Sequence, residues 1–145
     1  MKILEILTPR KLLGNFGEKS AVKYLRKNRY NILKRNYVSN GHEIDIIAYK
    51  DNTIVFIEVK TRTLGHENPK EQRPASSVNK LKQRSIIEAS RGYLATSSID
   101  GKKRFDIIEV YVSEGKKRKV DDIRHLINTF NLNTAYPPRT HRDGR

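Results

Sequence analysis

Three charged side chains stand in the most apolar part of this sequence. Two runs rich in Ile, Val and Phe, residues 44–49 and 53–59, flank a polar break at residues 50–52, and this pattern predicts a β-hairpin. The charged residues within these runs, or directly after the second one, are Asp45, Glu58 and Lys60. An unpaired charge buried in such a sheet costs several kcal/mol. Side chains of this kind at these positions therefore indicate a chemical role.

The register of the predicted hairpin brings the three side chains together. A turn centred on Asp51 and Asn52 places Asp45 opposite Glu58. Side chains alternate between the two faces of a strand, and directly opposed residues share a face, so Glu58 and Lys60 point the same way as Asp45. We therefore expect one cluster of two carboxylates and a lysine.

Two opposed carboxylates repel each other unless a cation lies between them. Mg²⁺ is a hard cation that proteins hold through one or two carboxylates together with substrate phosphates and waters. Lys60 adds a positive charge that would face a phosphate. The cluster therefore predicts a metal site that handles phosphate esters.

The spacing of the cluster, an Asp followed after twelve residues by Glu-x-Lys, resembles the core of PD-(D/E)xK nucleases. The chain also resembles the YraN-type family of small bacterial restriction-endonuclease-like proteins, which is related to Holliday-junction resolvases. The similarity extends over roughly residues 10–130. The segments that carry it are Gly17-Glu18-x-x-Ala21, Asn36-Tyr37, Glu43-Ile44-Asp45, Phe56 to Arg62, Ser77 and Val78 with Lys80, Arg104-Phe105-Asp106, and His125-x-x-Asn128-x-Phe130.

The resemblance implies an α/β fold with a restriction-endonuclease-like core, in which helices flank a central mixed β-sheet. It also implies metal-dependent hydrolysis of phosphodiester bonds in DNA, including branched or junction DNA. Asp45 and Glu58 would hold Mg²⁺ or Mn²⁺ together with the Val59 carbonyl, and Glu18 would complete the metal site. Lys60 would orient the attacking water or stabilise the phosphate. Junction cutting would require a homodimer, for which the apolar candidates are the first 14 residues and the last helix.

Glu18 has a second explanation. Helical spacing from about residue 15 to residue 28 places it on the same side as Ala21 and Leu25, facing the core. Acidic residues in the first turn of a helix are also common because they suit the helix dipole. Periodicity leaves both interpretations open, and the family resemblance favours the metal site.

Composition predicts one basic domain with a polyanionic partner. The 145 residues, 36% of them hydrophobic, suffice for one core, and the net charge of +14 favours nucleic acid. We expect an N-terminal segment at residues 1–14, a nuclease-like domain at 15–130 and a basic, disordered tail at 131–145. The chain has no cysteine, which excludes disulfides and thiolate zinc sites and fits a reducing compartment. No apolar run approaches a membrane span, so a cytoplasmic protein is the expectation.

Four basic residues outside the cluster are candidates for contact with nucleic acid. A polar loop, residues 61–76, follows Lys60 and is predicted to be either a flap that closes on a phosphate backbone or an ordinary solvated loop. A helix capped by Ser76 or Ser77 and running to about residue 95 follows it. The candidates in these two segments are Arg62, Lys70, Arg73 and Lys80.

The remaining pattern predicts a strand at residues 32–38, a strand at 104–112 and a last helix capped by Asp121 or Asp122. The helix is inferred from the spacing of Ile123, Leu126, Ile127 and Phe130. Asp106 is expected to pair with a nearby Arg or Lys. His42 is interpreted as a loop residue without a role, although a proton carrier or weak ligand is the alternative.

Two other functions remain open at this point. The chain could bind nucleic acid without cutting it, although the complete set of acidic residues argues for catalysis. The charges could also form a buried structural ion pair in which Lys60 neutralises Glu58. That interpretation leaves Asp45 unexplained unless Arg62 or Arg104 reaches it.

Overall fold

The computed structural model describes residues 8–64 and 78–139. Five strands form one sheet in the order β1-β2-β3-β4-β5, in which β3 and β4 are parallel and the other neighbours are antiparallel. The expected α/β fold with a mixed sheet flanked by helices is therefore confirmed. The elements in chain order are α1 (Pro9–Lys27), β1 (Asn31–Ser39), β2 (His42–Lys50), β3 (Thr53–Thr63), α2 (Lys80–Thr96), β4 (Lys102–Glu114), β5 (Arg118–Phe130) and α3 (Leu132–Ala135).

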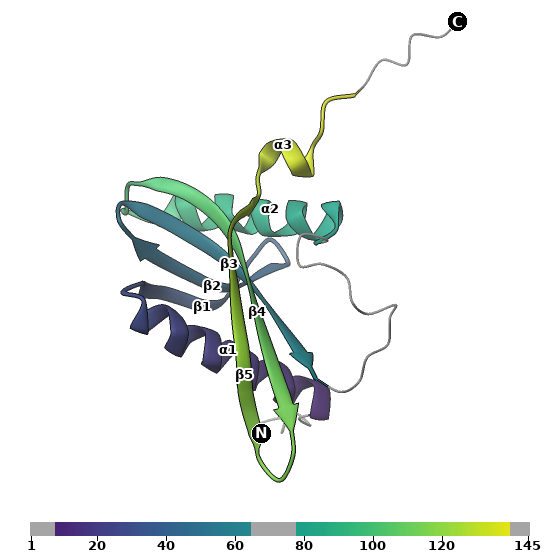
Figure 1. Cartoon of the computed structure of the whole chain (residues 1–145). Helices are drawn as coiled ribbons and strands as arrows, with labels where there is room; N and C mark the ends of the chain where they lie inside the picture. The colour runs from purple at the N-terminus through teal and green to yellow at the C-terminus, as the bar shows by residue number, and fades with distance from the viewer. Residues whose placement is uncertain (1–7, 65–77, 140–145) are drawn as a thin grey trace, which may run out of the picture.

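The two long helices cover opposite faces of the sheet (Figure 1). On one face, Ala21, Val22 and Leu25 of α1 pack against apolar residues of β2, β3 and β4. On the other face, residues of α2, among them Ile86 and Tyr93, pack with a second apolar cluster. The segment from β3 to β4 includes α2, as expected because parallel neighbours need a long crossover connection. The sheet is thus buried on both sides, and the ends of its central strands are the places where polar side chains can gather.

The hairpin of β2 and β3 has the predicted register. Lys50 lies opposite Thr53 and Ile46 lies opposite Ile57. Asp51 and Asn52 both have positive φ angles, 49° and 57°. A two-residue turn with this backbone matches the twist of the flanking strands, and Asp and Asn tolerate it better than most residues. The turn chemistry therefore determines which residues of the two strands face each other.

The first helix begins at Pro9, earlier than the predicted start near Asn15. The side chain of Thr8 accepts a hydrogen bond from the Lys11 amide and caps the helix. Proline is favoured at the first helical position, because its missing N–H would be unpaired there anyway. The expected N-terminal segment at residues 1–14 is therefore not separate from the domain, because α1 starts within it at Pro9. Residues 9–14 therefore belong to the helix that carries Glu18.

The predicted last helix is wrong, because residues 118–130 form strand β5. The β4–β5 pairing shifts register between Phe105 and Ile107 and again between Tyr111 and Val112. Asn128 has a positive φ angle of 55°. The four apolar residues do not share one face of the strand. Ile123 packs on the α1 side of the sheet, whereas Leu126 and Phe130 pack on the α2 side. Ile127 is 57% exposed, so the helical spacing does not mark a helical face.

Two boundaries near α2 also differ from the predictions. Asn79 caps α2 through a hydrogen bond from the Lys82 amide to its side chain, and Ser76 and Ser77 lie outside the described residues. Leu81, the second residue of α2, is an apolar residue that is 74% exposed. The predicted tail is ordered at its beginning, where α3 buries Ala135. The Ala135 carbonyl accepts a hydrogen bond from Arg84 of α2.

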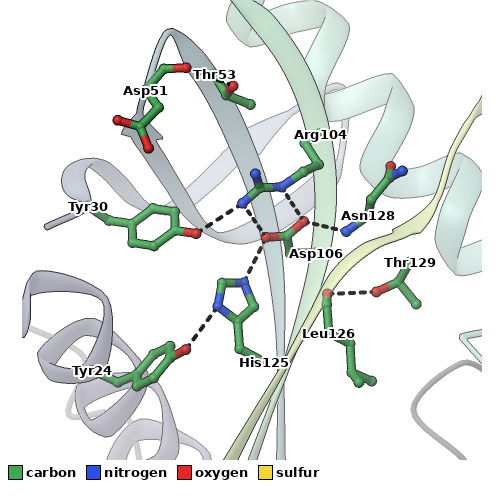
Figure 2. A network of polar contacts seen from close by, with 10 residues as sticks. All are labelled: Tyr24, Tyr30, Asp51, Thr53, Arg104, Asp106, His125, Leu126, Asn128 and Thr129. Carbon is green, nitrogen blue, oxygen red and sulfur yellow. Dashed lines mark hydrogen bonds and ion pairs between the residues drawn. The ribbon is translucent and has the colours of Figure 1, made fainter. Parts of the chain in front are cut away.

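A polar network on the α1 face joins four segments of the chain (Figure 2). Asp106 accepts two hydrogen bonds from Arg104, both 2.9 Å, and one from the Asn128 amide. His125 Nε2 lies 2.7 Å from Asp106 Oδ2, and its Nδ1 lies 3.2 Å from the hydroxyl of Tyr24 in α1. Arg104 also donates to Tyr30. The expected pairing of Asp106 with an Arg is confirmed, and the network ties α1 to β4 and β5.

Candidate active site

Asp45 lies where the β2–β3 ladder ends. The last pair at this end of the ladder is Ile46 with Ile57. Beyond it, Oδ2 of Asp45 accepts a hydrogen bond of 2.8 Å from the backbone amide of Val59. The carboxylate thus takes the place of a backbone acceptor. This bond fixes Asp45 beside the next residues of β3, including Glu58.

Glu58 is buried and only partly satisfied. It is 7% exposed, and its Oε1 lies 3.8 Å from Nζ of Lys60 and 3.7 Å from Nζ of Lys82. Its Oε2 is buried and has no hydrogen-bond partner among the described residues. Buried polar atoms nearly always have a partner, so an orphaned carboxylate oxygen needs an explanation. A cation or a proton at this oxygen would supply one.

The two carboxyl groups of Asp45 and Glu58 hold protons more tightly than ordinary acids. Burial, followed by the charge of Asp45, raises the pKa of Glu58 to about 7, although Lys82 and Lys60 oppose the shift. Burial also raises the pKa of Asp45, against the hydrogen bond from Val59. Near neutral pH the pair therefore retains a proton, and a divalent cation could replace it.

Glu18 reaches the same place from α1. Burial, Asp45 and Glu43 raise its pKa to about 7, whereas Arg35 and Asn36 lower it. The side-chain amide of Asn36 lies between Glu18 and Glu43, and with its nitrogen turned toward them it donates to both at 3.1 Å. We define the acidic cluster as Glu18, Glu43, Asp45 and Glu58. Glu43 and Asn36 were not predicted as site residues, although both lie in segments that carry the family resemblance.

Gly17 allows α1 to approach β3 closely. A Cβ atom built on Gly17 would lie 2.9 Å from the Cβ of Thr61 and nearer still to its hydroxyl oxygen. The neighbouring atoms belong to a short β-branched side chain that has little freedom to move. The glycine therefore sets the distance between Glu18 and the carboxylates on the sheet.

Replacing Gly17 with Ala is expected to push α1 away from β3 and withdraw Glu18 from the acidic cluster. Strain of this kind typically costs about 1–3 kcal/mol in unfolding free energy, which chemical denaturation would measure. Gly14→Ala is the matched control in the same helix, since a Cβ there meets no atom within 4 Å. Equal stability of the two variants would contradict the close approach.

The basic candidates are distributed differently from the prediction. Lys82, not Lys80, approaches Glu58, and Lys80 is exposed at the first position of α2. Arg62 pairs with the buried Glu109 at 3.1 Å, so its guanidinium is engaged within the sheet. Lys60 lies beside Glu58 as expected. Lys70 and Arg73, with most of the predicted loop, lie outside the described residues.

His42 begins β2 and contacts α2. Its Nδ1 lies 2.7 Å from the hydroxyl oxygen of Ser85. The contact joins the start of the strand to the helix that carries Lys82. The prediction that His42 lies in a loop is wrong, because it is a strand residue with a structural partner in Ser85.

The raised pKa of Glu58 predicts that the metal-free protein loses stability as the pH rises from 4.5 to about 7. In this window unfolded Glu58 releases its proton while folded Glu58 keeps it. Protonated Glu58 therefore stabilises the fold fully below the pKa that it has in the unfolded chain. This stabilisation is lost as the pH rises through its pKa in the folded protein. The shift corresponds to about 3 kcal/mol at most.

Urea denaturation in EDTA between about pH 5 and pH 8 tests this expectation, with Glu58→Gln as the comparison. The stability of the wild type should fall relative to the variant as the pH rises. Parallel stability curves for the two proteins would show that Glu58 is not perturbed.

A sequence model of the uncharacterised protein family UPF0102 matches residues 17–110. The match covers more than half of the chain and includes every residue of the acidic cluster. The chain belongs to the UPF0102 family. This finding confirms the YraN-type resemblance.

Similar UPF0102 proteins occur in several bacteria. One from Geobacter metallireducens is 44% identical over 123 residues, which cover 84% of this chain and 94% of that protein. Another, from Caldanaerobacter subterraneus, is 39% identical over 122 residues, covering 83% of this chain and 96% of its own. A third, from Clostridioides difficile, is 39% identical over 118 residues, covering 81% and 95%. UPF0102 membership establishes the family but no reaction.

Within the part of the UPF0102 chain that the structure describes, no helix is both long and apolar enough to cross a membrane.

Proposed function

We propose that this protein is a metal-dependent nuclease that hydrolyses phosphodiester bonds in DNA. The observation that carries the proposal is the pair of carboxylates Asp45 and Glu58, held close together where the β2–β3 ladder ends, with a buried Glu58 oxygen that has no partner among the described residues. Two lysines lie beside this pair, Lys60 on the strand and Lys82 on the helix. Carboxylates and lysines in this arrangement suit the hydrolysis of a phosphate ester. A surface that only binds a polyanion would gain nothing from carboxylates at its centre.

The residues present fit a divalent cation that is shared with substrate. Among the described residues no three acidic or histidine side chains already surround a common point. Mg²⁺ commonly uses only one or two carboxylates and takes its other ligands from waters and phosphates. The buried, unpartnered Oε2 of Glu58 supplies a free ligand atom for such an ion. We therefore propose Mg²⁺ or Mn²⁺ as the cofactor.

Asp45 and Glu58 would hold this ion, and Glu18 would help hold a second one or orient the first. The amide of Val59 points at Asp45, and because the N–H and C=O of a strand residue point to the same side, its carbonyl is expected to face the same ion. A bound divalent ion would lower the pKa of a water molecule and neutralise charge on the scissile phosphate.

The two lysines would act on the substrate. Lys60 would orient the attacking water or stabilise the negative charge that develops on the phosphate. Lys82, which the sequence did not single out, would add a second positive charge from α2. Charges fixed before the reaction stabilise a transition state without reorganising during it.

The structural ion-pair interpretation accounts for Glu58, which Lys60 approaches, but not for Asp45. It required Arg62 or Arg104 to neutralise Asp45. Arg62 pairs with Glu109, and Arg104 pairs with Asp106. Asp45 is instead bonded to the backbone amide of Val59, so neither arginine explains its position in the cluster.

Cleavage of labelled DNA by the purified protein tests the proposal. Duplex, single-stranded, flap and four-way-junction DNA would each be incubated with Mg²⁺, Mn²⁺ or EDTA. Metal-dependent cutting of at least one substrate is expected, and cutting of the junction would further imply a homodimer. Tight binding of these substrates without cutting under any condition would replace the nuclease with a nucleic-acid-binding protein.

A further inference from the structure

An open groove lies between α1 and the edge strand β1. It has a volume of about 450 Å³, and five of its six lining residues are basic. We call it the basic groove and define it by Lys19, Val22, Lys23, Arg26, Lys27 and Arg35. All five basic residues are exposed, whereas Val22 is buried at its floor.

The basic side chains of α1 form a continuous row. Lys19, Lys23 and Lys27 are four residues apart, so they lie on one side of the helix at intervals of about 6 Å. None of the five basic residues forms an ion pair with a described carboxylate. Like charges gathered without counter-charges repel one another, and a polyanion bound in the groove would relieve this repulsion.

The basic groove adjoins the acidic cluster. Glu18 directly precedes Lys19 in α1, and Arg35 directly precedes Asn36, whose amide contacts Glu18 and Glu43. The charge of Arg35 also lowers the pKa of Glu18. A chain of phosphates lying in the groove would therefore lead to Asp45 and Glu58.

We propose that the basic groove binds the phosphate backbone of duplex DNA without reading its sequence, and that it delivers the backbone to the acidic cluster. The inference rests on the proposed function for the identity of the polyanion. Single-strand-binding proteins stack bases on aromatic side chains, whereas this groove is lined by basic residues and one valine. Lys and Arg contacts to phosphates position a protein on DNA but carry no sequence information.

The test compares two variants that each lose three positive charges. The groove variant is Lys23→Gln/Arg26→Gln/Lys27→Gln, in which Gln maintains helix propensity. The control variant is Lys116→Gln/Lys117→Gln/Lys119→Gln, at exposed positions in the turn after β4 and at the start of β5. Binding of a fluorescent DNA duplex, a second duplex of unrelated sequence and a single strand would be measured by anisotropy in EDTA over a range of salt concentrations. Circular dichroism would verify folding of both variants.

The groove variant is expected to bind both duplexes about 10-fold more weakly or worse, and the slope of log K against log salt should fall by about 2–3. The control variant should retain the wild-type slope. Equal losses in the two variants, or tighter binding of the single strand than of the duplex, would overturn the proposal.

The cleavage assay separates this inference from the proposed function. If the wild type cuts DNA in Mg²⁺ and the groove variant binds and cuts equally well, the groove assignment is wrong and the nuclease stands. If the groove variant loses binding but the wild type never cuts, the groove stands and the nuclease does not.

Discussion

Glu58→Gln is expected to abolish DNA cleavage while leaving DNA binding nearly unchanged. The substitution keeps the size of the side chain but removes the charge from the carboxylate whose buried Oε2 has no partner among the described residues. Asp45→Asn should act in the same way, and Lys60→Ala should remove the charge that faces the phosphate. Loss of one preorganised charge typically lowers a rate about 10²- to 10³-fold.

Initial cleavage rates and duplex affinities of the three variants would be measured beside those of Glu88→Gln. Glu88 is an exposed carboxylate on α2 that pairs with Arg91, so its loss removes the same charge away from the site. The control should cut like the wild type. Unchanged cleavage in all three site variants would show that the site is assigned wrongly.

Asp106→Asn is expected to lower the free energy of unfolding by about 3–5 kcal/mol, because it leaves a guanidinium without its carboxylate in a buried network. Asp106 is 0% exposed and accepts hydrogen bonds from Arg104 and the Asn128 amide. An Asn side chain has one acceptor oxygen and would turn N–H groups toward existing donors. The loss should be measurable by urea denaturation at neutral pH.

The comparison variant is Asp122→Asn, which breaks an ion pair with Arg124 between two largely exposed side chains. Such a pair contributes about 0–1 kcal/mol. Burial alone raises the pKa of Asp106, but hydrogen bonds from His125, Arg104 and Asn128 bring it below its ordinary value. The contribution of Asp106 is therefore present above the ordinary pKa of Asp and is lost as the pH falls below it. A similar small effect of both substitutions would contradict a structural role for the network.

The central part of the site follows from short-range sequence rules. Asp51 and Asn52 adopt the left-handed backbone that a two-residue hairpin turn needs, and the apolar strands on either side continue the register as far as Ile46 and Ile57, the neighbours of Asp45 and Glu58. Each of these steps depends on neighbouring residues only. For this reason the pairing of the two carboxylates could be predicted before the structure was known.

The predictions that were wrong depend on which side of a helix or strand a residue faces, or on contacts between residues far apart in the sequence. Lys80 and Lys82 are two positions apart, about 200° around a helix, so only one can face the sheet. Which of the two lysines faces the sheet depends on where the helix begins. Asn79 caps the helix, but the sequence pattern does not distinguish it from Ser76 and Ser77. In β5 the apolar residues belong to both faces of the sheet, so their helical period is a coincidence that only the packing reveals.

Glu43 and Asn36 join the site through packing between α1, β1 and β2. Both residues are exposed on strands. A polar residue is ordinary at such a position, so its type alone does not indicate a role. From the sequence, the row of positive charges on α1 resembles an ordinary solvated helix face. The groove exists because this row lies beside Arg35 of β1.

The central claim, that Asp45 and Glu58 share a divalent cation, is tested most directly by titrating Mn²⁺ into the protein at about pH 8 and following the free ion by electron paramagnetic resonance. The account predicts saturable binding by the wild type and loss of that binding in Glu58→Gln. Binding should also weaken as the pH falls below 7, where Glu58 regains its proton. Equal Mn²⁺ binding by the wild type and the Glu58→Gln variant would contradict the claim.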